Sequence, residues 1–214
     1  MKRALFVGLF LVTLLSPVFA QDTMMITDFA KRFSDWKVKA FKGKANFQVK
    51  QSPKDMITLT TEGSSFMLAK EFRHFKMDDY PFINFEWMVE KLPKGADLRS
   101  KATDDQAAGL YVTLPSFPEF INFKAIGYVW ETSAPPGVYN SKGFGNIKYV
   151  VLKSQEKDLL GQWHAEKRNF AEDFQKLWGV RPGKRKVVIS LAADSDNTRT
   201  SSAASFGNVF FSRN

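Results

Sequence analysis

Apolar and polar residues alternate along much of the chain, and residues 83–90 show this pattern most clearly. Every odd position in the segment is apolar, and most even positions are polar. Successive side chains of a strand point to opposite faces of its sheet, so this period of two predicts a strand with one buried face. The residues assigned to the buried face are Ile83, Phe85, Trp87 and Val89.

Similar short runs recur from residue 45 to the C-terminus, separated by segments that contain proline, glycine and serine. Turn-forming residues at such intervals are typical of proteins with many short strands. No repeat of fixed period is present, which argues against a solenoid or a propeller. The predicted strands are residues 45–50, 56–61, 65–72, 81–92, 107–114, 125–131, 148–152, 186–192 and 205–212.

One segment has a helical period instead. Apolar residues at positions 170, 174, 177 and 178 form a single stripe, which predicts one amphipathic helix near residues 165–178. Gly179 is suited to end this helix, and Pro182 prevents its continuation. A short helical turn is also expected in the lead-in, residues 22–37.

Many antiparallel strands with a lone helix predict a mostly β protein, an antiparallel β-sandwich of the jelly-roll type. The chain has no cysteine, so it lacks the Cys, Trp and Cys signature of immunoglobulin domains. Its length of 214 residues suits one domain, and we expect residues 21–214 to form a single β-sandwich.

The first twenty residues predict an export signal. Lys2 and Arg3 precede an apolar run of about a dozen residues, and small residues at 18 and 20 suit a signal peptidase. A membrane-spanning helix needs about 20 apolar residues, so this run is too short, and no later run is longer. We therefore expect a periplasmic mature chain without a membrane span.

Composition and charge exclude several classes of function. The absence of cysteine removes thiol catalysis and Cys-ligated metals. The 31 Lys and Arg against 22 Asp and Glu give a net charge of +9, and removal of Lys2 and Arg3 lowers it to +7. The basic residues are dispersed and match no nucleic-acid-binding module, so we expect no nucleic-acid partner.

Catalytic motifs are missing from the sequence. The chain has two histidines and no P-loop, nucleophile elbow or zinc-protease motif. Glu86 and Glu131 lie on aromatic-rich predicted strands, and a glycosidase would need their carboxyl groups about 5–9.5 Å apart across a cleft. Both are more simply interpreted as solvated residues of an outer face.

Residues 194–198 form the densest polar cluster of the chain. Asp194 and Asp196 can offer oxygen ligands to a structural Ca²⁺, and Asp104 and Asp105 can complete such a site. The run lacks the glycine and the distal glutamate of an EF-hand loop, and Asx turns alone explain clusters of this kind.

Exposed aromatic residues are a further indication of a ligand. The aromatic residues that can line a concave face on which sugar rings stack are Tyr111, Tyr128, Trp130, Tyr139 and Trp163. Tyr128 and Trp130 share the side of Ile126 by alternation, which favours their burial.

Several motifs together span most of the mature chain, at residues 85–87, 92–99, 104–108, 110–112, 128–130, 161–163, 166–169, 194–198 and 206–207. In this order they resemble a bacterial family of exported proteins, the domain-of-unknown-function family 3047. The resemblance implies a jelly-roll sandwich similar to carbohydrate-binding modules, located in the periplasm and without an assigned activity.

Our leading hypothesis is a non-catalytic envelope protein that binds a glycan-like or other polyhydroxylated ligand at the strand ends, where loops gather. Aspartate and asparagine would contact hydroxyls, arginine would hold an acidic group, and aromatic rings would stack. The predicted ligand-binding residues are Glu86, Asp97, Arg99, Asp104, Asp105, Tyr111, Trp130, Glu131, Arg168, Asp194, Asp196 and Asn197.

Two alternatives remain open. One is a glycan hydrolase or lyase that uses Glu86 and Glu131, or the loop at residues 194–196. The other is a structural or partner-binding module of the envelope, in which Arg99 and Arg168 are buried against aspartates such as Asp105 and Asp194.

Overall fold

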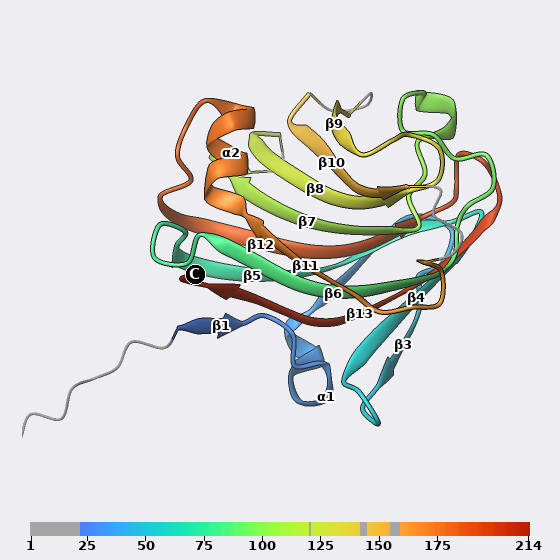
Figure 1. Ribbon diagram of the computed structural model, residues 1–214, viewed down its shortest axis with the longest axis horizontal. Coiled ribbons are helices and arrows are strands. Elements are labelled where there is room, and N and C mark those ends of the chain that lie inside the picture. The colour runs from blue at the N-terminus through green and yellow to red at the C-terminus, as the bar shows by residue number, and fades with distance from the viewer. Residues whose placement is uncertain (1–21, 120, 142–144, 155–158) are drawn as a thin grey trace, which may run out of the picture.

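The computed structural model describes residues 22–119, 121–141, 145–154 and 159–214. The predicted signal peptide, residues 1–20, lies outside the described residues. Two β-sheets pack face to face into a sandwich, and helix α2 lies at one end of it (Figure 1). The mostly β sandwich expected from the alternating pattern is confirmed.

Sheet A contains six strands in the order β11-β6-β13-β4-β3, with β1 paired to β13. All of its strand pairs are antiparallel. Its strands are β1 (Thr23–Met25), β3 (Asn46–Lys50), β4 (Met56–Glu62), β6 (Phe82–Lys91), β11 (His164–Asn169) and β13 (Ser201–Ser212).

Sheet B contains seven strands in the order β2-β5-β12-β7-β8-β10-β9. The sheet is mixed, because β8 and β10 run parallel while its other pairs are antiparallel. Its strands are β2 (Lys37–Lys42), β5 (Ser65–Lys76), β7 (Ala108–Pro115), β8 (Phe123–Glu131), β9 (Gly137–Asn140), β10 (Ile147–Ser154) and β12 (Lys184–Asp194).

The nine strands predicted from alternation are present, but four others were missed. Strand β2 is exposed along its whole length, so its sequence carries no buried face. The strands β1 and β9 are only three and four residues long, too short to show a period. Edge strand β11 alternates half-buried and exposed polar residues, without an apolar face.

The predicted start of the helix at residue 165 is wrong, because residues 164–169 are strand β11. Helix α2 covers Phe170–Trp178, where Asn169 caps it by accepting a hydrogen bond from the backbone N–H of Glu172 at 3.1 Å. Gly179 ends the helix with a φ of 70°, as expected. The lead-in also contains a four-residue helix, α1 (Phe29–Arg32), followed by a 3₁₀ turn (Phe33–Asp35).

Aromatic side chains from both sheets fill the core. The rings of Trp87 on β6 and Trp130 on β8 have centroids 5.7 Å apart, and both residues are fully buried. Phe85 meets Trp87 edge-on at 5.1 Å, and Phe170 and Phe174 of α2 close the end of the core. Each such side chain stabilises the fold by about 1.5–3 kcal/mol, so the core needs no disulfide.

Candidate functional site

The outer face of sheet B carries three tyrosines, on β7, β10 and β9. Tyr111 lies between the fully buried Leu110 and Val112, so its side chain points away from the core. Strand register places Tyr111 opposite Gly127, and Gly127 opposite Tyr149. We call this outer surface the tyrosine face; its central row consists of Lys37, Ala69, Ser190, Tyr111, Gly127, Tyr149 and Tyr139, in strand order.

Two glycines seat the ring of Tyr111. A Cβ atom at Gly109 would lie 2.6 Å from Cε2 of Tyr111, and one at Gly127 would lie 2.6 Å from its Cε1. Carbon atoms in normal contact are about 3.5–4.0 Å apart, so only glycine fits at either position. The ring therefore lies down across β7 and β8, with one edge over each glycine.

Tyr149, which is 7% exposed, and the half-buried Tyr139 continue this face towards the edge of the sheet, in one apolar cluster with Leu98 and Ala134. The rings of Tyr149 and Tyr111 meet edge-on, with centroids 6.3 Å apart and planes at 74°. Burial raises the pKa of both phenols well above its ordinary value, so both rings are neutral at physiological pH. The hydroxyl of Tyr139 donates a hydrogen bond to the carbonyl of Pro135 at 2.9 Å.

Polar groups gather at one end of the tyrosine face. The hydroxyl of Tyr111 donates to Oε1 of Gln106 at 3.3 Å, and Nε2 of Gln106 donates to Oδ1 of Asp104 at 2.7 Å. Asp194 at the end of β12 also lies near, because its backbone N–H donates to the carbonyl of Gln106 at 2.9 Å. The predicted residues Asp104, Tyr111 and Asp194 are thus brought together.

The carboxyl group of Asp194 is held in its protonated form at neutral pH. Burial is the main cause, and repulsion from Asp105 and Asp196 adds to it, which together raise its pKa to about 8. The backbone N–H of Asp196 donates to Oδ1 of Asp194 at 3.1 Å and opposes this shift. A protonated carboxyl group at this end can donate a hydrogen bond as well as accept one.

Pockets border the tyrosine face at both ends of its row. One of about 320 Å³ lies at the β5 end and has Lys37, Ala69, Glu71 and Val188 in its wall. Another of about 470 Å³ is lined by Arg99, Ser133, Pro135, Pro136 and Ser154. It adjoins the β9 end, because Pro135 accepts the hydrogen bond from Tyr139.

Asp105 ties two loops together rather than facing solvent. It is fully buried and accepts hydrogen bonds from the backbone N–H of Asn197 at 2.9 Å and of Thr198 at 2.8 Å. The hydroxyl of Thr198 donates to it as well, at 2.6 Å. The side-chain amide of Asn197 donates to the carbonyl of Lys101 at 2.9 Å, so this contact also joins the two loops.

The carboxylates of Asp105, Asp194 and Asp196 each offer an oxygen atom within 4.8 Å of the others. Asp105 already accepts three hydrogen bonds, and Asp196 accepts one from the hydroxyl of Ser65 at 2.9 Å. Calcium takes 6–8 oxygen ligands. The calcium site near Asp194 and Asp196 stays a prediction.

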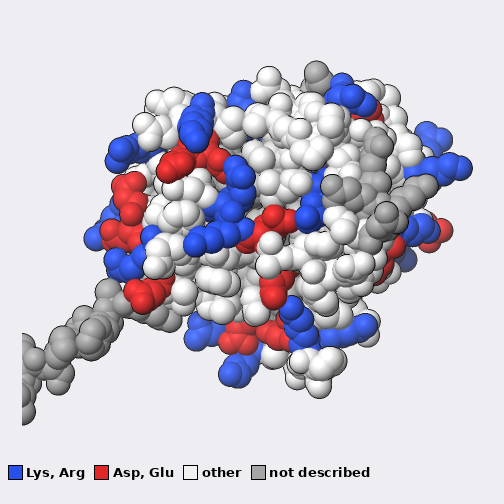
Figure 2. Space-filling view, in the orientation of Figure 1, with Lys and Arg blue, Asp and Glu red and all other residues white. Residues whose placement is uncertain are grey.

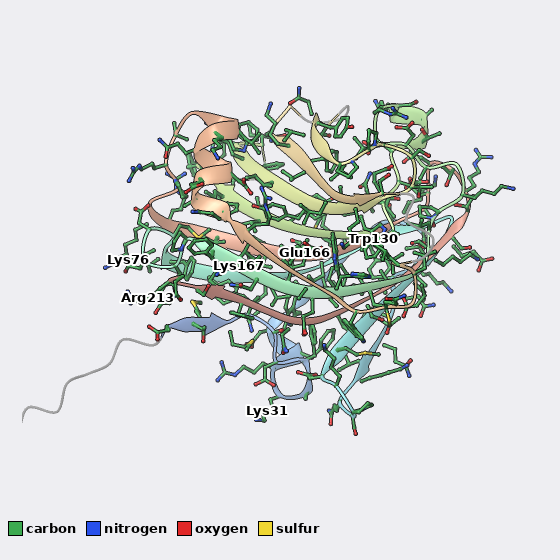
Figure 3. All side chains as sticks on the ribbon, viewed as in Figure 1. Lys31, Lys76, Trp130, Glu166, Lys167 and Arg213 are labelled. Carbon is green, nitrogen blue, oxygen red and sulfur yellow. The ribbon has the colours of Figure 1, made fainter. Side chains whose placement is uncertain are left out.

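Glu131 and Trp130 are buried, not placed on a binding surface. Glu131 accepts hydrogen bonds from the backbone N–H groups of Ser133 and Ala134, both at 2.7 Å, so its interpretation as a solvated residue is wrong. Burial raises its pKa. Trp130 lies in the interior, where Lys153 Nζ is 5.7 Å from its ring centroid and 3.5 Å from Glu166 (Figure 3).

Glu86 belongs to the opposite side of the sandwich. Its carboxylate lies 2.9 Å from Nζ of Lys54 and accepts a hydrogen bond from the backbone N–H of Asn208 at 3.2 Å. Glu86 is on the outer face of sheet A, whereas Glu131 is buried at the end of a sheet B strand. The two carboxylates therefore do not face each other across a cleft as a glycosidase pair would.

The predicted arginine–aspartate pairs have other partners. Arg168 donates to Asp173 through Nε at 3.0 Å and Nη2 at 2.8 Å, and Asp173 also accepts from the hydroxyl of Tyr128. Arg99 pairs with Asp97 at 2.6 Å. The structural-module alternative required these arginines to pair with Asp105 and Asp194, but they pair instead with aspartates two and five residues away in the chain.

Gln106, Gly127 and Tyr149 belong to this site but were not predicted. Isolated glycines at 109 and 127, each inside a strand, were the available signal, because such glycines often mark a close approach of another group. The approaching group, Tyr111, is identified only by the pairing of β7 with β8.

The sequence model of a family described as "Protein of unknown function (DUF3047)" matches residues 34–210. No curated protein matches the chain at the level of sequence.

Solved structures with a similar fold include the family 11 carbohydrate-binding module of cellulase Lic26A-Cel5E from Clostridium thermocellum, with a TM-score of 0.49 and 10% identity over 90% of this chain and 95% of that one. A structure of carbohydrate-binding modules from the β-sandwich superfamily gives a TM-score of 0.48 and 10% identity over 86% of this chain and 60% of that one. Tailspike protein 4 of bacteriophage CBA120 gives a TM-score of 0.42 and 10% identity over 85% of this chain and 20% of that one. The chain thus spans less than two thirds of the length of the latter two structures.

Proposed function

The chain belongs to the DUF3047 family, and we propose that its tyrosine face binds a glycan-like or other polyhydroxylated ligand in the cell envelope, without catalysis. One observation carries the proposal: the Tyr111 ring lies across a floor made by Gly109 and Gly127. The half-buried ring is a flat apolar surface that adjoins a small apolar cluster of Leu98, Val129, Ala134, Tyr149 and Val151.

The chemistry of a sugar matches such a platform. A pyranose ring has an apolar face of C–H groups, which can lie on an aromatic ring, and a rim of hydroxyl groups that need hydrogen-bond partners. Gln106, Asp104 and the protonated Asp194 lie next to Tyr111 and supply acceptors and donors. A site of this kind combines apolar area with few, fixed polar groups.

The length of the row suits an extended ligand. The row from Ala69 on β5 to Tyr139 on β9 crosses six neighbouring strands. Adjacent strands lie about 4.8 Å apart, so the row is about 24 Å long. The pockets at its two ends have volumes of about 320 and 470 Å³, in the range of small-ligand sites. We infer that an oligosaccharide lies across the strands, from β5 towards β9.

The predicted signal peptide supports an envelope location for this activity. A basic run, a short apolar run and small residues at 18 and 20 are the features that direct export. An exported protein meets cell-envelope polysaccharides, which makes them the first ligands to test. Periplasmic location is part of the proposal, and fractionation of cells that express the full chain would test it.

A glycan array followed by titration calorimetry tests the proposal. We expect the mature chain to bind at least one oligosaccharide and Tyr111→Ala to lose at least about tenfold in affinity, since it removes the platform. Tyr111→Phe keeps the ring and loses only its hydrogen bond to Gln106, so its loss should be a few-fold.

The matched control is Trp163→Ala, which removes an aromatic ring near Gly207 of sheet A and should leave the affinity unchanged. Circular dichroism would confirm that all variants are folded. Equal affinity of Tyr111→Ala and the unmodified chain would overturn the proposal, and so would the absence of binding across a broad array.

A further inference from the structure

The turn between β7 and β8 holds two apolar side chains in solvent. Phe117 is 92% exposed and Ile121 is 63% exposed, which makes them the two most exposed large apolar side chains among the described residues. A globular protein normally places phenylalanine in its interior. The exposure of both residues in one turn therefore calls for a partner.

Hydrogen bonds join residues 116–118 of this turn to Asn122. The backbone N–H of Ser116 donates to the carbonyl of Asn122 at 2.7 Å, and that of Asn122 donates to Pro118 at 2.9 Å. The side-chain amide of Asn122 donates to the carbonyl of Phe117 at 3.1 Å. Lys186 ties the turn to β12 through Glu119 at 2.7 Å. Phe117 and Ile121 thus project from a braced turn.

Cationic side chains lie beside the turn, at the end of the sandwich that also carries α2 (Figure 1). Nζ of Lys124 and Nζ of Lys148 lie 5.4 and 5.2 Å from the ring centroid of Trp178. Arg181 follows α2 and is exposed. Within the described part of the chain, none of these three cations forms an ion pair with a carboxylate.

We propose that this end of the molecule, which we call the turn end (Phe117, Ile121, Lys124, Lys148 and Arg181), docks on the surface of an anionic lipid bilayer. Phe117 and Ile121 would enter the boundary between headgroups and acyl chains, as apolar residues of membrane-surface proteins do. The cations beside them, of which Lys148 donates a hydrogen bond to Oδ1 of Asn140, form no ion pair within the described residues and would contact lipid phosphates. The flexible stems of lysine allow their charges to stay in water while the apolar tips insert.

A bilayer suits these residues better than a protein partner. A stable protein interface buries about 800 Å² on each side, which two side chains on one turn do not approach. A lipid surface needs no complementary shape and accepts isolated apolar tips next to positive charge. No helix of the described residues is long and apolar enough to cross a membrane, so the contact would be with the surface.

Strand β2 provides a matched contrast within the same chain. Phe41 is 54% exposed and Val38 is 45% exposed, and lysines alternate with them. Nζ of Lys39, however, lies 4.9 Å from the centroid of the Phe41 ring, and lysines on a free edge strand oppose pairing with other chains. We assign β2 to edge protection and only the turn end to membrane contact.

Co-sedimentation with lipid vesicles tests the proposal. The mature chain should bind vesicles that mix phosphatidylglycerol with phosphatidylcholine, and bind more weakly at high salt. Phe117→Ser combined with Ile121→Ser should lower the partition coefficient at least about tenfold, since two apolar side chains no longer leave water. Lys124→Gln combined with Lys148→Gln should lower it several-fold and reduce its salt dependence.

Phe41→Ser is the control for loss of one exposed phenylalanine and should bind vesicles like the unmodified chain. Tyr111→Ala should do so too, which separates this proposal from glycan binding. Vesicle binding that survives Phe117→Ser with Ile121→Ser, or no vesicle binding by the unmodified chain, would overturn the proposal. Loss of glycan binding instead of vesicle binding in that variant would assign the turn to the sugar and would overturn it as well.

Discussion

On the outer face of each sheet an aromatic ring packs closely against a glycine, but the two faces differ in what lies over the ring. On sheet A, a Cβ atom at Gly207 would come within 3.3 Å of the Trp163 ring. Nζ of Lys54 lies 4.2 Å from the centroid of that ring. On sheet B, no lysine or arginine within the described ranges lies over the ring of Tyr111.

Charged side chains of sheet A also have partners. Lys54 contacts Glu86 at 2.9 Å, and Glu90 accepts a hydrogen bond from the hydroxyl of Ser205 at 3.1 Å. Figure 2 shows acidic and basic side chains intermixed on the side where β6, β11 and β13 lie in front. Under our proposal, a glycine beneath the ring is not sufficient for ligand binding, and the ring must also have no cation over it, as is the case for Tyr111.

The largest effect is expected when a glycine beside the aromatic ring of each face is replaced by alanine, which adds one methyl group. In Gly127→Ala the new Cβ would lie 2.6 Å from the Tyr111 ring and 3.2 Å from that of Tyr149, and both rings are packed in place. We expect a loss of about 1–3 kcal/mol in the free energy of unfolding, because the rings must shift. Glycan affinity should fall at least about tenfold. Urea denaturation and calorimetry would measure both.

Gly207→Ala on sheet A is the matched variant. Its Cβ would lie 2.8 Å from Cε of Lys54, near the end of a flexible side chain that can move aside. The expected loss is below about 1 kcal/mol, and glycan affinity should not change. If both variants lost equal stability and equal affinity, the proposed difference between the two faces would be wrong.

The two faces should also respond to pH in opposite directions. Asp194 beside Tyr111 has a pKa raised from 3.8 to about 8 by burial, so the folded state binds an extra proton between these values. Its contribution to the free energy of unfolding is fully present below pH 3.8 and is lost as pH rises towards 8. Asp194→Asn should therefore gain about 1–2 kcal/mol relative to the unmodified chain between pH 5 and pH 8.

Glu86 on sheet A has the opposite sign. Burial raises its pKa, but the hydrogen bonds from Lys54 and from the backbone N–H of Asn208, together with the charge of Lys54, lower it further than burial raises it. Its contribution is present above pH 4.5 and is lost as pH falls through the lowered pKa. Glu86→Gln should thus lose stability at neutral pH and little at acidic pH. Parallel pH profiles for the Asp194 and Glu86 variants would contradict the comparison.

The alternation of apolar and polar residues predicted most of the fold, because a strand with one buried face has apolar residues at every second position. Residues 83–90 are the clearest case, with Ile83, Phe85, Trp87 and Val89 all buried. The site was harder to predict, since it depends on register. Tyr111 was selected from sequence, but the glycine across from it at 127 is assigned only by strand pairing. Likewise, no pattern in the sequence shows that Glu131 is buried and accepts hydrogen bonds from the backbone of Ser133 and Ala134.

Lys54→Gln is the variant with the smallest expected effect, because it removes the cation over Trp163 and leaves both glycine positions unchanged. It also removes the ion pair with Glu86 on β6, whose two side chains are 31% and 30% exposed. The ion pair and the cation–π contact together should contribute less than about 1 kcal/mol to stability. Urea denaturation would measure this loss. If a ring without a cation over it were sufficient for binding, this variant would acquire glycan affinity on sheet A. We expect none, because the group of Gln106, Asp104 and Asp194 that flanks Tyr111 lies beside sheet B.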